Sequence, residues 1–356
     1  MKCTNSKDKG SLHERGFHEG SSHKIRGLYR RIAVRLSALL CAAAVSLCAL
    51  SGCGSLSYEM AYSVDAAVSG FNVVRRQETR TAVPFASDLC VVTGEVAANG
   101  LPGAEDMGPS MLLDLKTCEV LYAHNVHERI HPASITKVMT ALVALENGNL
   151  ESTLTATDAV RISEAGAVLC NLRSGDTMTL DQALRILLTY SANDVAMLIA
   201  ENIGGTVEHF LEMMNQKARE LGATNTNFAN PHGLTDINHY TTAYDLYLIF
   251  KEAIKNETFN EIIHMTSYQT TYYDKNGKAK EFKKQTSNLY LKGERKAPEN
   301  VTVIGGKTGT TAAAGYCLIL LSRDESGSPY ISIVMHAGST DELYNRMTDL
   351  LKQIHN

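Results

Sequence analysis

The order of apolar and polar residues predicts a mixed α/β domain that begins near residue 109. Apolar runs at 111–115 and 119–122, separated by Lys116-Thr117-Cys118, are typical of a β-hairpin. Apolar residues at helical spacing predict helices over 134–147, 181–189, 196–200, 206–222 and 242–254. The rest of the pattern predicts a surface hairpin at 268–282, strands at 301–310, 316–322 and 330–337, and a closing helix at 340–354.

The first 52 residues have the pattern of an export signal. Residues 1–35 carry nine basic and three acidic side chains, and an apolar run follows at 36–50, interrupted by two serines. This run is too short for a comfortable membrane span. It ends in Leu50-Ser51-Gly52-Cys53, which resembles the lipobox of bacterial lipoproteins, where the signal is cleaved before a cysteine that carries lipid. We expect cleavage after residue 52 and a lipid on Cys53; an ordinary signal beside an incidental cysteine is the alternative.

Without this leader the chain is acidic and long enough for one large domain with a tether. Of the 34 basic and 38 acidic residues, nine and three belong to the leader, so the mature net charge is near −10. Nucleic acid is therefore not an expected partner, because phosphate binding requires a basic patch. Residues 54–108 show no sustained period, and we interpret 53–108 as a lipidated tether that precedes a catalytic domain at 109–356.

The cysteines and histidines of the mature chain do not predict a metal centre or a cofactor. The four remaining cysteines lack metal-ligand spacing, and Cys118 and Cys317 are interpreted as small core residues in strands, with a disulfide left open. His127-Glu128-Arg129-Ile130-His131 matches the His-Glu-x-x-His pattern of zinc proteases, which requires a helix through both histidines. Pro132 follows directly and favours extended backbone at the residue before it, so we expect no zinc site.

Ser134 and Lys137 lie one turn apart at the start of a predicted helix, so their side chains share a face. A serine hydroxyl is a poor nucleophile unless a base takes its proton, and an ammonium group is no base. Lys137 must therefore be neutral, and a helix N-terminus, partial burial and a second cation nearby all lower the pKa of a lysine. The same helix start directs the N–H of Ser134 towards the site, where it could stabilise an oxyanion.

Two further motifs follow, and each also has a purely structural interpretation. The segment 190–194, with Ser191 and Asn193, separates two apolar helices; it suits a capped turn but also presents a hydroxyl and an amide to a cleft. Lys307-Thr308-Gly309 ends a predicted strand, where the glycines, Gly305-Gly306 included, allow either a β-bulge or a substrate backbone against the strand edge. His232, in a turn, is interpreted as a structural histidine rather than a general base.

Ser134-x-x-Lys137, Ser191-x-Asn193 and Lys307-Thr308-Gly309, in this order, resemble the three motifs of penicillin-binding proteins and serine β-lactamases. Their flanking residues look like those of low-molecular-mass D-alanyl-D-alanine carboxypeptidases, and the resemblance covers about residues 109–356. It implies an α/β (α+β) fold of two subdomains, of the β-lactamase/transpeptidase type. An antiparallel sheet flanked by the terminal helices would face an all-helical cluster, with the active site in the cleft between them.

The resemblance also implies the reaction. The enzyme would remove the terminal D-alanine from peptidoglycan stem pentapeptides through an acyl-enzyme, and β-lactam antibiotics would be covalent inhibitors. Ser134 would be the nucleophile, Lys137 its base and Ser191 a proton relay.

The substrate-binding residues follow from the same resemblance. Asn193 would hold the substrate amide, and Lys307 and Thr308, in the motif that Gly309 completes, would bind the terminal carboxylate. The N–H groups of Ser134 and Thr310 would form the oxyanion hole.

Many relatives carry a second, β-rich domain and an amphipathic membrane-binding tail. Here the sequence stops one helix after the last strand, so we expect attachment through Cys53, at the outer face of the bacterial cytoplasmic membrane.

Two alternatives have the same motifs. A class A β-lactamase needs a glutamate in Glu-x-x-Leu-Asn for fast deacylation. The nearest match here, Glu208-His209-Phe210-Leu211, is followed by Glu212, and Glu208 falls on the outer face of its predicted helix. The other alternative is a catalytically idle penicillin-binding sensor or scaffold, against which the intact motifs argue.

Overall fold

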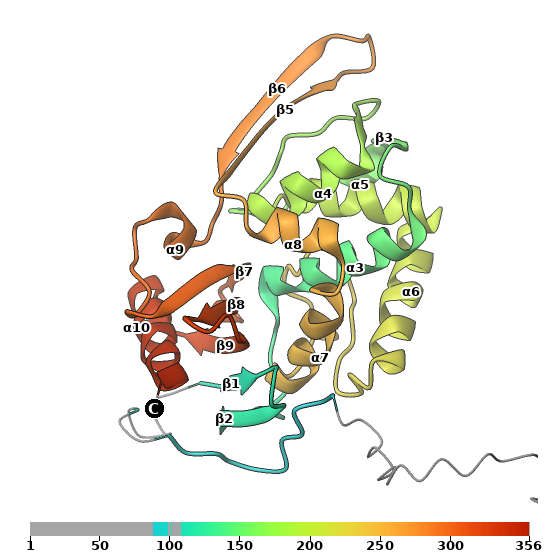
Figure 1. Cartoon of the computed structure of the whole chain (residues 1–356). Coiled ribbons are helices and arrows are strands. Elements are labelled where there is room, and N and C mark those ends of the chain that lie inside the picture. Colours follow the sequence, from blue (N-terminus) through green and yellow to red (C-terminus); the bar gives the residue numbers. More distant parts are fainter. Residues whose placement is uncertain (1–87, 99–100, 102–107, 356) are drawn as a thin grey trace, which may run out of the picture. The chain divides into compact units, whose positions relative to one another are not determined.

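The computed structural model describes residues 88–98, 101 and 108–355 (Figure 1). The predicted signal peptide at 1–52, the lipidation site Cys53 and the segment 54–87 lie outside the described residues. The helices of the described part are all too short or too polar to cross a membrane.

A five-stranded antiparallel sheet has the strand order β2-β1-β9-β8-β7. Its strands are β1 (Ser110–Asp114), β2 (Glu119–His124), β7 (Val301–Thr311), β8 (Gly315–Asp324) and β9 (Pro329–Ala337). The central strands β8 and β9 are almost continuously apolar, because helices cover both faces of the sheet. The edge strand β7, which carries Lys307, Thr308 and Thr310, has no neighbour on its outer side within the described residues. All the strands predicted for this sheet are confirmed.

Helix α10 (Thr340–Leu351) covers one face of this sheet, and a helical cluster covers the other. The cluster consists of α3 (Lys137–Asn147), α4 (Leu180–Thr189), α5 (Asn193–Gly204), α6 (Val207–Glu220), α7 (Ala243–Ala253) and α8 (Glu257–Ile263). Threonine side chains cap the N-termini of three of them: Thr179, Thr206 and Thr242. The predicted helices are confirmed, since their spacing of apolar residues matches the face each helix buries.

A second, four-stranded sheet lies beside the helical cluster, in the order β3-β4-β5-β6. Short strands β3 (Thr153–Thr155) and β4 (Thr177–Thr179) join the hairpin of β5 (Ser267–Tyr273) and β6 (Ala279–Gln285), which projects from the domain in Figure 1. The Asp274 carboxylate accepts N–H bonds from Asn276 and Lys278 in the turn. This confirms the predicted hairpin; β3 and β4 are too short to show a period. A short helix, α9 (Leu289–Lys292), and 3₁₀ turns η2 (Ala133–Thr136), η3 (Asp158–Val160) and η4 (Lys352–His355) complete the fold.

The domain begins before Pro109, which corrects the predicted boundary of the tether. Cys90 is fully buried, and its N–H donates to the Tyr247 hydroxyl at 2.9 Å. Val96 forms a β-bridge with Ala123 of β2. Residues 88–98 therefore pack on the domain as an irregular segment. The sequence missed this because two or three buried side chains in a polar stretch produce no period.

Two local predictions about cysteine and histidine segments have different outcomes. Cys118 lies in the β1–β2 turn with a φ of +58° and is half-buried, so its assignment to a strand is wrong. Cys317 is fully buried in β8, as predicted. Residues 127–131 are not helical, as Pro132 predicts, and His131 Nδ1 lies 2.8 Å from the carbonyl oxygen of His239. Among the described residues no three metal-ligating side chains gather.

Candidate active site

The candidate site lies where the 3₁₀ turn η2 meets the edge strand β7. A Cβ atom at Gly309 would lie 3.0 Å from the Ser134 nitrogen, so glycine lets this strand approach the turn that carries the serine. A Cβ at Gly305 would lie 2.1 Å from Ile263 O, and the ladder shifts register between Val303 and Gly305. Gly305 therefore serves the β-bulge and Gly309 the close packing against η2, while a substrate backbone against the open edge of β7 stays a prediction.

The loop at 230–234 packs against the turn that carries Ser134. Ala133, a non-glycine residue, has a φ of +46°, which is uncommon and needs support from its surroundings. Gly233 supplies that support at close range: a Cβ there would lie 1.8 Å from the carbonyl oxygen of Ala133. The Asn230 side chain accepts the N–H of Gly233 at 2.7 Å and closes the loop. The partly exposed Ser134 side chain is thus positioned by a strained turn and a fixed loop.

Lys137 is completely buried, and its Nζ has three partners. Nζ lies 2.9 Å from Ser134 Oγ, 2.7 Å from Asn193 Oδ1 and 2.5 Å from the carbonyl oxygen of His232. The two carbonyl oxygens can only accept, so they take both hydrogens of a neutral amine. The nitrogen lone pair is then left for the Ser134 hydroxyl, which can donate to it. This arrangement suits a nucleophile beside its general base.

The charge of the site favours a neutral Lys137. Burial lowers the pKa of Lys137 well below its ordinary value, the positive charge of Lys307 lowers it further, and the carboxylate of Asp194 partly raises it. Burial also lowers the pKa of Lys307, to about 7. The second cation on which the sequence analysis relied is therefore present, but removal from water is the larger cause.

Ser191 and Lys307 form the second half of the site. Ser191 lies between α4 and α5 with a φ of +73°, and its side chain is almost buried. Lys307 Nζ donates to Ser191 Oγ at 2.9 Å and to the carbonyl oxygen of Thr308 at 2.9 Å. Asn193, the first residue of α5, links this loop to Lys137. The structure thus gathers the residues of the three motifs, which are up to 175 positions apart in the chain, counted from Ser134 to Gly309.

Asp194 is a site residue whose role the sequence analysis missed. Its buried carboxylate accepts N–H bonds from Cys170 at 2.9 Å and Leu172 at 2.9 Å, and burial raises its pKa. The neighbouring Asn193 N–H donates to Val168 O at 2.8 Å. Together these bonds fasten the loop at 168–172 to the start of α5. The available signal was an acidic residue in the first turn of a largely apolar helix.

Thr308 and Thr310 lie on β7 next to the site. Thr308 Oγ1 is 2.5 Å from the hydroxyl of Ser287, a residue that the sequence analysis did not single out. Exposed Thr310 borders a cavity of about 400 Å³ at the end of β7, which is also lined by Tyr316 and His336. The cavity leaves open space beside the position proposed for the oxyanion.

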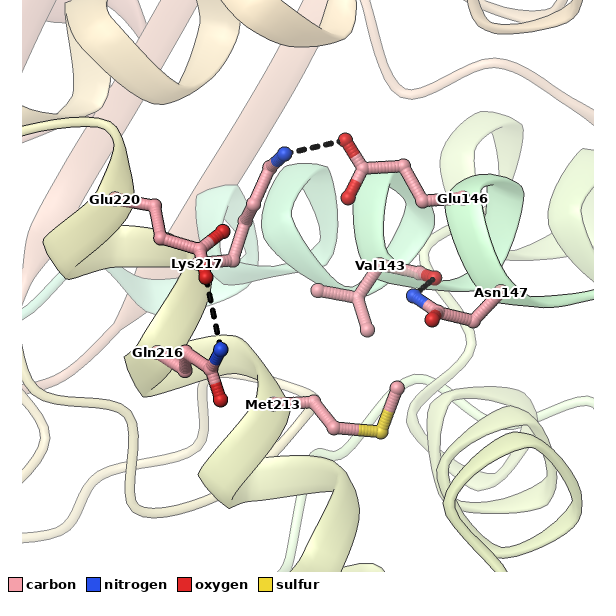
Figure 2. A pocket seen from close by; sticks show the side chains of 7 residues that line it. All are labelled: Val143, Glu146, Asn147, Met213, Gln216, Lys217 and Glu220. Atoms are coloured by element: carbon pink, nitrogen blue, oxygen red, sulfur yellow. Dashed lines mark hydrogen bonds and ion pairs between the residues drawn. The ribbon is translucent and has the colours of Figure 1, made fainter.

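Another cavity, of about 240 Å³, lies between α3 and α6, away from the motifs (Figure 2). Its polar side chains already have partners: Lys217 pairs with Glu146 at 2.5 Å, Gln216 with Glu220 at 2.8 Å, and Asn147 donates to the carbonyl oxygen of Val143 at 2.8 Å. It begins at Val143, six residues or about 9 Å along the helix from Lys137. We therefore place no chemistry there.

Two buried histidines next to η2, His232 and His239, have structural roles. His232 Nδ1 accepts the N–H of Leu234 at 3.2 Å, in keeping with the predicted role. His239 Nδ1 accepts the N–H of Ala229 at 3.0 Å, which leaves the proton on Nε2 to donate to Thr136 Oγ1 at 2.7 Å. Burial lowers the pKa of His232 to about 3 and that of His239 to about 4.

We expect these histidines to make the fold sensitive to mild acid. In the unfolded chain both histidines bind protons near pH 6.5. In the folded chain His232 stays neutral until about pH 3 and His239 until about pH 4. The unfolded state therefore binds more protons below pH 6.5, and the free energy of unfolding falls by up to about 1.4 kcal/mol per pH unit for each histidine. Urea unfolding at pH 7.0, 6.0 and 5.0 measures this slope.

His209→Gln is the matched control, because His209 is exposed on α6 and should leave the slope unchanged. His239→Gln should make the slope shallower. Equal slopes for the wild type and His239→Gln would contradict the assignment.

Comparisons with known proteins give relatives of one kind. A family model described as D-alanyl-D-alanine carboxypeptidase, peptidase family S11, matches residues 102–339. The chain is 35% identical to D-alanyl-D-alanine carboxypeptidase DacF of Bacillus subtilis, over 70% of this chain and 62% of DacF. It is 32% identical to DacA of Haemophilus influenzae, over 63% of this chain and 56% of DacA. The chain thus spans less than two thirds of these relatives' length.

Solved structures agree with the fold. The DD-transpeptidase of Streptomyces K15 superposes with a TM-score of 0.64 and 27% identity, over 70% of this chain and 96% of that protein. Penicillin-binding protein D2 of Listeria monocytogenes gives a TM-score of 0.61 at 24% identity, over 73% of this chain and the whole of that one. The two-subdomain α/β fold implied by the motifs is therefore confirmed.

Proposed function

Since the chain belongs to the D-alanyl-D-alanine carboxypeptidase family, we propose that it removes the terminal D-alanine from peptidoglycan stem pentapeptides through an acyl-enzyme on Ser134. One observation carries this proposal: the 2.9 Å contact between Ser134 Oγ and Nζ of a fully buried Lys137 whose two hydrogens have other acceptors. This contact provides a base that is neutral and already aimed at the nucleophile.

The reaction has two steps. In the first, the Ser134 hydroxyl gives its proton to Lys137 and its oxygen bonds to the carbonyl carbon between the two D-alanines. The N–H groups of Ser134 and Thr310 stabilise the oxyanion. The C–N bond then breaks, and the departing D-alanine amine takes the proton held by Lys137, with the hydroxyl of Ser191 as the relay. In the second step water gives a proton to Lys137 and attacks the ester carbonyl. The bond between that carbon and the Ser134 oxygen breaks, and Lys137 returns the proton to the Ser134 oxygen.

The terminal carboxylate of the substrate fits the Lys307 side of the site. Because burial lowers the pKa of Lys307 to about 7, an arriving carboxylate would draw a proton onto the amine and form a charge-assisted contact. Thr308 adds a hydroxyl beside it.

The direct test is release of D-alanine. The soluble domain, incubated with a pentapeptide that ends in D-Ala-D-Ala, is expected to liberate one D-alanine per peptide, measured by a coupled oxidase assay. A pentapeptide that ends in D-Ala-L-Ala is the control and should stay intact. A protein that binds penicillin but leaves both peptides intact would support the idle sensor instead.

The same proposal separates this protein from a β-lactamase. Glu208, the nearest match to the deacylating glutamate, is exposed on α6, where it cannot activate a water at Ser134. We therefore expect a bound penicillin to stay attached for minutes or longer, read by mass spectrometry of the acylated protein. Nitrocefin turnover at about ten per second, an ordinary enzymatic rate, would favour the β-lactamase.

We also propose that the protein is exported and anchored through lipid on Cys53 at the outer face of the bacterial cytoplasmic membrane. The support is the sequence Leu50-Ser51-Gly52-Cys53 after a basic and an apolar stretch. Two or three acyl chains hold a protein firmly, whereas a single one does so only marginally. Metabolic labelling with an alkyne palmitate analogue, followed by mass spectrometry of the mature N-terminus, tests this. A mature protein without lipid in the medium would contradict it.

A further inference from the structure

Ser287 is a hydroxyl-bearing residue held in a fixed position at the site, between the end of β6 and the start of α9. Its backbone N–H donates to the carbonyl oxygen of Thr189 at 3.2 Å, two residues before Ser191. On one side of it, the Thr286 N–H donates to Thr266 O at 2.9 Å. On the other side, buried Asn288 caps α9 by accepting the N–H of Tyr290 at 3.1 Å. The position of Ser287 is therefore set on three sides before any substrate arrives.

The side chain of Ser287 points at β7, the strand that carries Lys307 and Thr308. Its Oγ lies 2.5 Å from Thr308 Oγ1, and both side chains are partly exposed, so a ligand can reach them. A bond between two hydroxyls uses only one of their two hydrogens, and the other remains free to donate. Lys307 Nζ donates to the backbone carbonyl oxygen of the same Thr308 at 2.9 Å, which holds the amine at the residue that bears one of the two hydroxyls. Two adjacent O–H donors beside an amine suit a carboxylate, which accepts with both of its oxygens.

We propose that Ser287 is a further substrate-binding residue, which forms with Thr308 a hydroxyl pair that holds the free carboxylate at the end of the peptide. This inference rests on the proposed function, because it takes the D-alanine carboxylate as the group bound beside Lys307. When the carboxylate enters, the two hydroxyls turn from each other to its two oxygens. Ser287 thereby contributes to selecting peptides with an ionised C-terminus over peptides whose end is blocked.

The test compares the carboxylate with its ester. Ser287→Ala is assayed on a thioester substrate that ends in a free carboxylate and on the methyl ester of the same compound. A hydrogen bond to a charged group corresponds to about a 10–100-fold effect, so kcat/KM for the acid should fall by that factor, mostly through KM. The value for the methyl ester should change by less than about threefold, because the ester has no charge for the hydroxyl to stabilise.

Two other variants separate binding from structural damage. Ser287→Thr keeps the hydroxyl and should restore most of the activity on the acid. Ser267→Ala is the matched control, because Ser267 is exposed and lies opposite Gln285 in the β5–β6 hairpin. This variant should behave as the wild type on both substrates. Equal losses on the acid and the ester, or no loss on either, would overturn the proposal.

Penicillin acylation keeps this test independent of the proposed function. Benzylpenicillin has a free carboxylate, and its methyl ester does not, so the same ratio of acid to ester can be measured with the acylation rate. If the wild type releases no D-alanine, the proposed function fails, while an acid-selective slowing of acylation in Ser287→Ala still supports the inference. If D-alanine release is normal and the ratio does not change, only the inference fails.

Discussion

Ser134→Ala is expected to abolish both covalent labelling by a fluorescent penicillin and release of D-alanine. The hydroxyl oxygen of Ser134 is the atom that would bond to the substrate, and no other described serine lies at Nζ of Lys137. Removal of a nucleophile that acts as a unit with its base eliminates nearly all of the catalysed rate. The measurement is in-gel fluorescence after incubation with the labelled penicillin, together with the D-alanine assay.

The control for this prediction must show that the variant is folded. Ser134 is only partly buried, so loss of its hydroxyl should leave the urea unfolding midpoint close to that of the wild type. Ser163→Ala should label normally, because Ser163 is exposed in the loop between η3 and β4. Unchanged labelling of a folded Ser134→Ala protein would mean that the nucleophile has been assigned to the wrong residue.

Lys137→Ala is expected to slow acylation by a factor of about 100 or more, the usual scale for loss of a general base. The wild-type rate should also fall as the pH is lowered, because protonation of Nζ removes the lone pair that accepts the Ser134 proton. Burial lowers the pKa of Lys137, so the wild type should keep its rate far below the pH at which an ordinary lysine would be protonated. Stopped-flow acylation over a range of pH measures both effects.

Lys217→Met is a matched control, because Lys217 belongs to the same helical cluster but pairs with Glu146 away from the motifs (Figure 2). It should acylate at the wild-type rate. A Lys137→Ala variant that acylates within about threefold of the wild type would contradict the assignment of the base, since such a base is worth at least 100-fold. A wild-type rate that depends on pH as an ordinary lysine does would show that Nζ is charged in the resting protein.

The sequence by itself determined most of the local structure and predicted which side chains form the site. Helices with one buried face, such as α6, and the buried strands β8 and β9 have periods that a sequence displays directly. The three motifs, taken in order, also predicted a nucleophile and its base and indicated the family that the comparisons then showed. These features depend on residues close together in the chain or on fixed spacings, and both are visible without coordinates.

The tertiary structure decided how these residues act. The neutral state of Lys137 depends on complete burial and on acceptors from Asn193 and His232, which come from two distant segments. Ser287 and Asp194 have ordinary local sequences, and only their distances to Thr308 and to the loop at 168–172 give them a role. The same holds for residues 88–98, whose few apolar side chains have no period but fit the surface of the domain. Proximity between segments far apart in the chain sets desolvation and hydrogen bonding, and a local pattern contains neither.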